Sequence, residues 1–170
     1  AASGLLARTF ESLHDRDFRY FWGGMLLLMG GVNIQMLARG QLAYDLTGSP
    51  LAVGLVGAGF APPILLLSLF GGVVADRFDR KRIIQTGQLV SMFIALFVAV
   101  SIVTGTITLI HLVAASLMQG TMWAFLMPAR QAIIPQIVGR DRMVNAIALN
   151  SSGMALMTLA APGIGGLVYA

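Results

Sequence analysis

The chain has 170 residues, of which 57% are hydrophobic and 11% are charged, and its formal net charge is +4. Soluble domains carry roughly 25% charged residues, so this composition excludes an ordinary soluble globular enzyme, and its hydrophobicity excludes a disordered chain. The basic residues stand in short clusters between apolar runs, which excludes a nucleic-acid-binding surface. No cysteine is present, so disulfides and thiolate metal sites are excluded as well.

Four stretches of the chain contain no Asp, Glu, Lys or Arg, and a membrane-spanning helix needs about 20 such apolar residues. These stretches are Tyr20–Ala38, Leu46–Ala75, Ile83–Ala129 and Met143–Ala170. The turn-prone Thr47–Pro50 opens the second stretch, and Thr104–Thr108 is the only place to split the third, which is too long for one helix. The sequence therefore predicts five membrane-spanning helices, at about 18–44, 51–75, 83–103, 109–127 and 144–168.

Prolines predict two interruptions within this pattern. Pro62 and Pro63 lie in the middle of the second span, where they remove backbone donors and should kink the helix. The segments Glu11–Phe21 and Ala129–Val138 mix apolar and polar residues, which favours helices that lie in the membrane interface. We expect Pro135 to break the second of these segments.

The cations are distributed asymmetrically around the five spans. Ten of the eleven Lys and Arg residues lie before the first span, between the second and third, or between the fourth and fifth. The opposite loops, around 45–50 and 104–108, contain none. Because cytoplasmic loops are enriched in Lys and Arg, we expect a cytoplasmic N-terminus. The sequence thus predicts an all-α, multi-pass protein of the cell membrane, in a bacterium the inner membrane, with membrane lipids as partners.

A pair of glycines recurs along the chain. Gly71 and Gly72 lie near the end of the second span, and Gly165 and Gly166 lie at the corresponding place in the fifth, 94 residues later. Since these two spans run in opposite directions, the recurrence suits an inverted three-helix repeat of the kind that transporters use. Five spans would then be one repeat and part of a second, and we expect the chain to be a fragment.

The segment between the second and third spans is the most informative. Gly72 permits close approach of another helix. Asp76 lies at the membrane boundary, where a carboxylate needs pairing or hydrogen bonds. Arg77, Arg80 and Lys81 can pair with it, bind lipid phosphates or set the topology. On these residues alone, a plain basic loop that only determines topology remains an alternative.

This segment resembles the signature between the second and third helices of the major facilitator superfamily, G-x-x-x-D-R-x-G-R-[KR]. The match comprises Gly72, Asp76, Arg77, Arg80 and Lys81, with Asp79 replacing the second Gly. Leu46–Gly54 and Pro128–Ser151 look similar to the exporter branch that includes enterobactin exporters. The resemblance implies that 1–170 is part of the N-terminal, six-helix half of a transporter, whose sixth helix and C-terminal half are absent here. It also implies that the motif helps to hold a cytoplasmic gate closed.

Two further motifs of the superfamily are partly present. Ala161–Gly166 resembles the end of the fifth-helix antiporter motif, in which Pro162 would bend the helix and Gly165 and Gly166 would allow tight helix packing. This likeness implies a proton-coupled exporter. The fourth-helix motif, R-x-x-x-G, is only half present, because Gly120 is there but Ser116 occupies the place of the Arg.

Five polar or flexible side chains inside the spans are candidates for the transport path. Gln35 and Arg39 share one face of the first span, and Arg39 is either a vestibule residue or an anchor to lipid headgroups. Gln119 and Met122 lie on the fourth span, where Met122 also suits packing between helices. Asn150, in the fifth span, either faces the path or makes a helix–helix hydrogen bond.

The leading functional hypothesis is a secondary transporter that exports a small, partly apolar compound, such as a drug or siderophore, in exchange for protons by alternating access. An uptake permease or uniporter of the same superfamily and a non-transporting membrane scaffold or subunit are the alternatives. The sequence contains no nucleophile–base set, phosphate loop or metal-ligand spacing, so we expect no enzymatic activity, metal or cofactor. The expected partners are the small-molecule substrate, protons and the missing C-terminal half.

Overall fold

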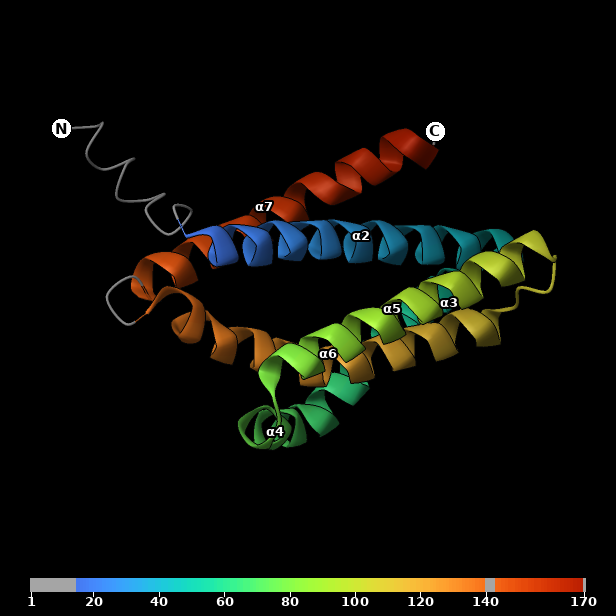
Figure 1. The fold of residues 1–170 in the computed structure, drawn as a ribbon. Coiled ribbons are helices and arrows are strands. Elements are labelled where there is room, and N and C mark those ends of the chain that lie inside the picture. The colour runs from blue at the N-terminus through green and yellow to red at the C-terminus, as the bar shows by residue number, and fades with distance from the viewer. Residues whose placement is uncertain (1–14, 140–142, 170) are drawn as a thin grey trace. The chain divides into compact units, whose positions relative to one another are not determined.

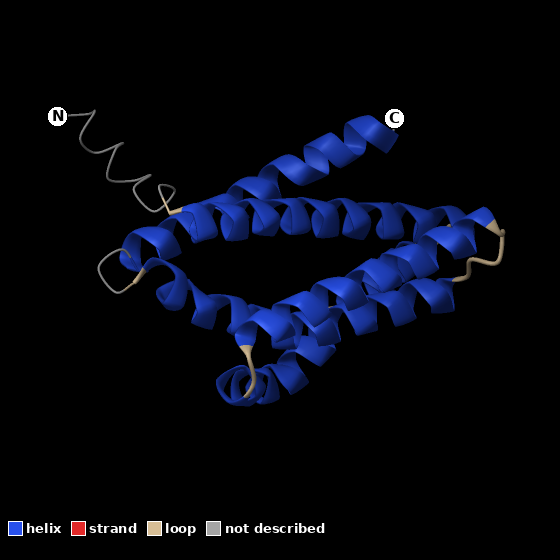
Figure 2. Ribbon diagram, in the orientation of Figure 1, coloured by secondary structure: helices blue, strands red, loops and turns tan. Residues whose placement is uncertain are grey.

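The computed structural model describes residues 15–139 and 143–169, and all regular secondary structure in these ranges is helical (Figures 1 and 2). The helices are α2 (Arg16–Thr47), α3 (Pro50–Ala58), α4 (Ala61–Arg77), α5 (Arg80–Val103), α6 (Leu109–Val138) and α7 (Met143–Tyr169). Within the described residues, five helical segments are long and apolar enough to cross a membrane, with α3 and α4 together forming one of them. The predicted all-α architecture with five spans is therefore confirmed.

The helix ends follow ordinary capping chemistry. The Asp15 carboxylate accepts hydrogen bonds from the backbone amides of Asp17 (2.9 Å) and Phe18 (3.3 Å) at the start of α2. Three glycines with positive φ follow the ends of α2, α5 and α6, namely Gly48 (63°), Gly105 (69°) and Gly139 (75°). Only glycine adopts this left-handed conformation without steric cost, so these positions stop the helices and turn the chain.

The second span is interrupted where the sequence predicted a kink. α3 ends at Ala58, a turn occupies Gly59 and Phe60, and α4 begins again at Ala61. Pro62 and Pro63 stand in the first turn of α4, where their missing amide hydrogens cost the helix nothing. The two prolines thus start a new helix, and the break lies just before them.

The fourth span is longer than predicted. α6 continues to Val138, through both Pro128 and Pro135, so the prediction that Pro135 breaks this segment is wrong. A proline within a helix removes one backbone hydrogen bond and need not end the helix when the neighbouring turns are satisfied. The helix ends only at Gly139, whose amide donates to the Pro135 carbonyl at 3.2 Å. Of the segments predicted to lie in the interface, Glu11–His14 falls outside the described residues, and Arg16–Phe21 and Ala129–Val138 are the ends of the continuous helices α2 and α6. Their place in the membrane interface stays a prediction.

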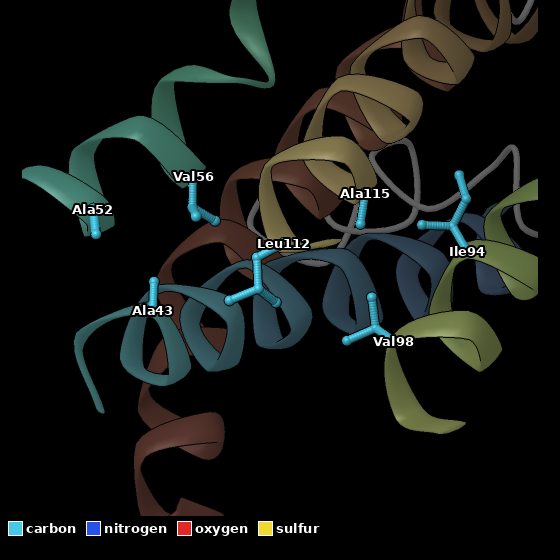
Figure 3. Packing of buried hydrophobic residues seen from close by; sticks show 7 residues of the cluster. All are labelled: Ala43, Ala52, Val56, Ile94, Val98, Leu112 and Ala115. Carbon is cyan, nitrogen blue, oxygen red and sulfur yellow. The ribbon is translucent and has the colours of Figure 1, made fainter. Parts of the chain in front are cut away.

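The chain divides into two compact units. The terminal unit comprises Ala1–Leu37 and Ile133–Ala170, and the central unit comprises Ala38–Ala132. The central unit has a core of small and branched apolar side chains from α2, α3, α5 and α6 (Figure 3). In the terminal unit, Phe18 is buried against Ile134, Ala146 and Leu149, with Trp22 packed beside them. Large apolar side chains outside these cores are exposed, for example Leu65, Leu66 and Leu69 on α4, as expected for a surface in contact with lipid.

Candidate gate and transport path

The predicted signature occupies the turn between α4 and α5, and Arg80 connects this turn to α6. Its Nε donates to the Ala75 carbonyl at 3.3 Å, and its Nη1 donates to the Ala132 carbonyl at 3.1 Å. Ala75 lies in the last turn of α4, where carbonyls have no later amide of the helix as donor. The Arg80 guanidinium therefore satisfies a helix end and ties it to the C-terminal part of α6 within the central unit.

The two acidic residues of the motif have different roles: Asp79 caps α5, and Asp76 does not pair with Arg80 as the sequence had suggested. Asp79 is the N-cap of α5, and its Oδ1 accepts from the Lys81 amide at 2.9 Å. Its Oδ2 lies 3.9 Å from the Arg82 Nε, in an exposed ion pair. Asp76 is exposed, and the Arg80 guanidinium donates to the Ala75 and Ala132 carbonyls and not to the Asp76 carboxylate. Arg77 and Lys81 are exposed beside it.

The glycine that allows close helix packing is Gly71 and not Gly72. A Cβ at Gly71 would collide with the Ala124 carbonyl of α6, whereas a Cβ at Gly72 would meet nothing within 4 Å in the described structure. Pro128 lacks an amide hydrogen, so the Ala124 carbonyl has no donor four residues later in the helix. The backbone of α4 lies directly against this acceptor, at Gly71.

A second close contact joins α6 to the break between α3 and α4. A Cβ at Gly120 would collide with the Phe60 carbonyl, and the Ser116 Cβ lies 3.4 Å from the place of a Cβ on Gly59. The Phe60 and Trp123 rings meet edge to face, with centroids 5.7 Å apart. Ser116 thus stands on a tightly packed face of α6, where its small side chain fits beside the neighbouring backbone.

Gln119 and Met122 lie in the central unit. Gln119 is 3% exposed, and its Nε2 donates to the Ser91 Oγ of α5 at 3.0 Å. Met122 packs against the core cluster of the central unit. Both residues of α6 thus contact side chains of neighbouring helices. For Met122, this contact corresponds to the alternative of packing between helices.

Arg39, Gln35 and Asn150 complete the path candidates. Arg39 is 6% exposed and lies in the central unit, and its two alternatives, a vestibule residue and an anchor to lipid headgroups, stay predictions. Gln35 and Asn150 are partly buried in the terminal unit. The Asn150 Nδ2 lies 3.8 Å from the Met154 Sδ on its own helix, and its Oδ1 is buried with no hydrogen-bond partner among the described residues.

The fifth-helix motif gives one close contact. A Cβ at Gly165 would lie 3.2 Å from the Leu37 Cδ2 and 3.5 Å from the Ile34 Cγ1 of α2, so this glycine lets α7 and α2 approach. A Cβ at Gly166 would meet nothing within 4 Å in the described structure. The α7 backbone remains helical through Pro162.

The terminal unit also contains a cavity that sequence reasoning missed. It has a volume of about 360 Å³ and is lined by residues of α2 and α7, including Trp22, Asn145, Ser152 and Leu156. Trp22 Nε1 donates to the Leu149 carbonyl at 3.2 Å. No short motif marks this cavity, because its walls come from residues more than 120 positions apart that only the fold brings together.

Comparison with known proteins agrees with this architecture. The sequence matches the transmembrane secretion effector family of major facilitator proteins over residues 7–170. Its relatives include an uncharacterized MFS-type transporter, YkuC, of Bacillus subtilis (26% identical, covering 91% of this chain and 36% of the relative) and the staphyloferrin A transporter of Staphylococcus aureus (24%, covering 89% and 38%). The enterobactin exporter EntS of Shigella boydii is another (30%, covering 86% and 33%).

These comparisons confirm the predicted resemblance to the major facilitator superfamily, whose members are transport proteins. The chain spans about a third of the length of the curated relatives it matches. No solved structure gives a significant match. With five membrane-spanning segments and a family match over nearly its whole length, the chain is a multi-pass membrane protein that belongs to the transmembrane secretion effector family of the major facilitator superfamily.

Proposed function

We propose that this chain forms the first five membrane helices of a transporter that exports a small, partly apolar compound in exchange for protons, by alternating access. The observation that carries this proposal is the motif turn, in which Arg80 links the ends of α4 and α6 while Asp76 remains exposed. A rigid turn that presents one exposed carboxylate suits a contact made in one state of a transporter and broken in the other.

The complete transporter would supply the remaining parts of the path. The relatives are nearly three times as long as the matched region, so we propose that a sixth helix and a second helical half follow the five helices described here. The partner of Asp76 would then come from that second half, where a helix N-terminus or a cation can stabilise a carboxylate. The motif residues Gly72, Arg77 and Lys81 would lie at the same cytoplasmic contact.

Two features support export with proton coupling. The relatives include a protein named as an enterobactin exporter, and the family is described as a secretion effector. The motif around Pro162, Gly165 and Gly166 resembles that of antiporters. Ser116 replaces the Arg of the fourth-helix motif, so coupling would rest on other groups, and Arg39 is a charged side chain buried inside a span, a position typical of substrate and proton paths.

Reconstitution of the complete protein in liposomes tests the direction and the coupling. An imposed proton gradient should drive a fluorescent, partly apolar compound such as Hoechst 33342 against its concentration gradient, toward the side opposite to proton flow. An uncoupler should abolish this accumulation, because the proton gradient is its only energy source.

Other outcomes identify the alternatives. Flux that follows only the gradient of the compound would indicate a uniporter, and accumulation in the direction of proton flow would indicate an uptake permease. A complete absence of flux across a panel of amphipathic compounds would favour a scaffold or subunit. The isolated 170-residue chain serves as the control, and we expect it to give no flux, since half of the proposed path is missing from it.

A further inference from the structure

The cavity of the terminal unit has the size and composition of a small-molecule site. Its volume of about 360 Å³ lies at the lower end of the range for ligand pockets, roughly 300–1,000 Å³. Its lining is mostly apolar, through Ala148, Leu149 and Leu156, with few polar groups. Such pockets derive affinity from apolar contact and orientation from a small number of polar side chains.

The aromatic wall of the cavity is held in place before any ligand binds. Trp22 Nε1 donates to the Leu149 carbonyl at 3.2 Å, which fixes the indole along α7. Gly153 lies against the same ring, because a Cβ there would come within 3.0 Å of Trp22 Nε1 and 2.8 Å of the Leu26 Cδ2. A tryptophan anchored on two sides provides a preorganised surface on which another aromatic ring can pack.

The polar groups of the lining favour a neutral ligand. Asn145 and Ser152 are seven residues apart on α7, two helical turns, so both lie on the face that lines the cavity. Ser152 is exposed, and its hydroxyl both donates and accepts hydrogen bonds. None of the seven lining residues carries a titratable side chain, so a charged ligand would lose its hydration without gaining a counter-ion.

We propose that this cavity is a binding site for the transported compound, and that the compound recognised there is neutral and aromatic with a hydroxyl or similar polar substituent. Its ring packs against Trp22, and its substituent hydrogen-bonds to Ser152 or Asn145. This inference rests on the proposed function and refines it by naming a substrate class and a site on α2 and α7.

A cysteine-protection experiment tests the site directly, because the chain contains no cysteine of its own. In the complete protein, with any cysteine outside this region removed, Ser152→Cys and Ser151→Cys each provide one reactive thiol. Both serines are exposed neighbours on α7, but only Ser152 lines the cavity. The measured quantity is the rate of labelling by N-ethylmaleimide in the presence of 4-nitrobenzyl alcohol.

At a concentration of 4-nitrobenzyl alcohol about ten times its Kd, we expect the labelling rate at Ser152→Cys to fall about tenfold, and the rate at Ser151→Cys to stay unchanged. Cyclohexylmethanol, whose ring is saturated and not aromatic, and 4-nitrobenzoate, which is an anion, should protect much less. Adding Trp22→Ala should remove the protection, whereas adding Trp22→Phe, which keeps a ring, should retain most of it.

Three results would overturn the proposal: no protection at either position, equal protection at both, or equal protection by the aliphatic alcohol, which would indicate a lipid-filled gap. Protection is an equilibrium measurement and needs neither a gradient nor flux. A complete protein that exports but shows no protection would therefore contradict this site alone, and one that shows protection without flux would contradict only the proposed function.

Discussion

At the scale of single residues, the motif turn owes its shape to hydrogen bonds with backbone carbonyls more than to ion pairs. The ion pair between Arg82 and Asp79 is long and exposed, and such pairs contribute at most about 1 kcal/mol. Arg80 instead satisfies two carbonyls with geometrically fixed donors of one planar guanidinium. Arg80 thus holds the backbone of the motif turn in place, while the carboxylate of Asp76 remains available for another contact.

Arg80→Lys should therefore be far more damaging than Arg82→Lys. A lysine retains the charge but cannot span two carbonyls with a planar fork, so the change should cost about 1–2 kcal/mol of stability and reduce export about tenfold. Arg82→Lys, at a side chain that is 85% exposed, should leave both quantities nearly unchanged. Thermal unfolding and export rates of the purified variants measure the difference, and equal effects of the two changes would contradict the role given to Arg80.

Asp76→Asn should reduce export about tenfold or more, since removing one charge of a partly desolvated contact changes a conformational equilibrium by roughly 2–4 kcal/mol. Insertion and expression should be unaffected. Asp79→Asn is the matched control, because Asn caps a helix about as well as Asp and the bond to the Lys81 amide can persist. Export at the parent rate by both variants would leave the loop with a role in topology only.

At the scale of helices, the two glycine pairs perform the same task in the two spans where the sequence repeats them. The first glycine of each pair, Gly71 or Gly165, lies against a neighbouring helix, and the second, Gly72 or Gly166, is open. α4 uses its glycine to approach α6, and α7 uses its glycine to approach α2. In an inverted three-helix repeat, the second span corresponds to the fifth and the first to the fourth. Since α4 belongs to the second span, α6 is the fourth, α7 the fifth and α2 the first, the contact of α4 with α6 is equivalent to that of α7 with α2.

Alanine substitution of the four glycines should give a graded series. Gly71→Ala should destabilise most, by about 1–3 kcal/mol, because its methyl group would meet the backbone carbonyl of Ala124. Gly165→Ala should cost less, since the nearest atom is the flexible tip of Leu37. Gly72→Ala and Gly166→Ala should be close to neutral. Melting temperatures of the four variants in one detergent test this order, and a larger effect at Gly72 than at Gly71 would contradict it.

Hydrophobic patterning predicted the helices well, because spans and turns depend on local properties such as charge-free length and the glycines at 48 and 105. It could not predict which glycine of a pair faces a neighbour, since that depends on the rotation of each helix. It also overestimated Pro135 as a helix breaker, because the surrounding turns of α6 compensate for one lost hydrogen bond. The cavity beside Trp22 required α2 and α7 to be brought together, which no local pattern encodes.

At the scale of the whole molecule, the distribution of cations predicts the orientation of the chain in the membrane. The turns at Gly48 and Gly105 lie at the ends of α2 and α5, in segments without Lys or Arg. The turn between α4 and α5 is flanked by four cations, Arg77, Arg80, Lys81 and Arg82. Successive spans alternate in direction, so these turns should lie on opposite sides of the membrane, with the cationic one in the cytoplasm.

Cysteine substitution of turn residues tests this orientation in intact cells. Ser49→Cys and Thr106→Cys should react with a membrane-impermeant maleimide from outside, and Phe78→Cys should react only after the membrane is permeabilised. Phe78 is well suited to this purpose because it is 65% exposed in the cationic turn. Labelling of Phe78→Cys alone in intact cells would show that the N-terminus faces the exterior.

The division of the chain into units has a consequence for how the protein is made. The central unit is contiguous in sequence, and its hydrogen bond from Arg80 to Ala132 spans 52 positions. The terminal unit joins two separate stretches of the chain, and the Trp22 Nε1 on α2 donates to the Leu149 carbonyl, 127 positions later. Helices enter a membrane in the order of synthesis and pack afterwards. The face of α2 around Phe18 is therefore exposed until α7 has been made, and lipid or the insertion machinery has to shield it in the interval.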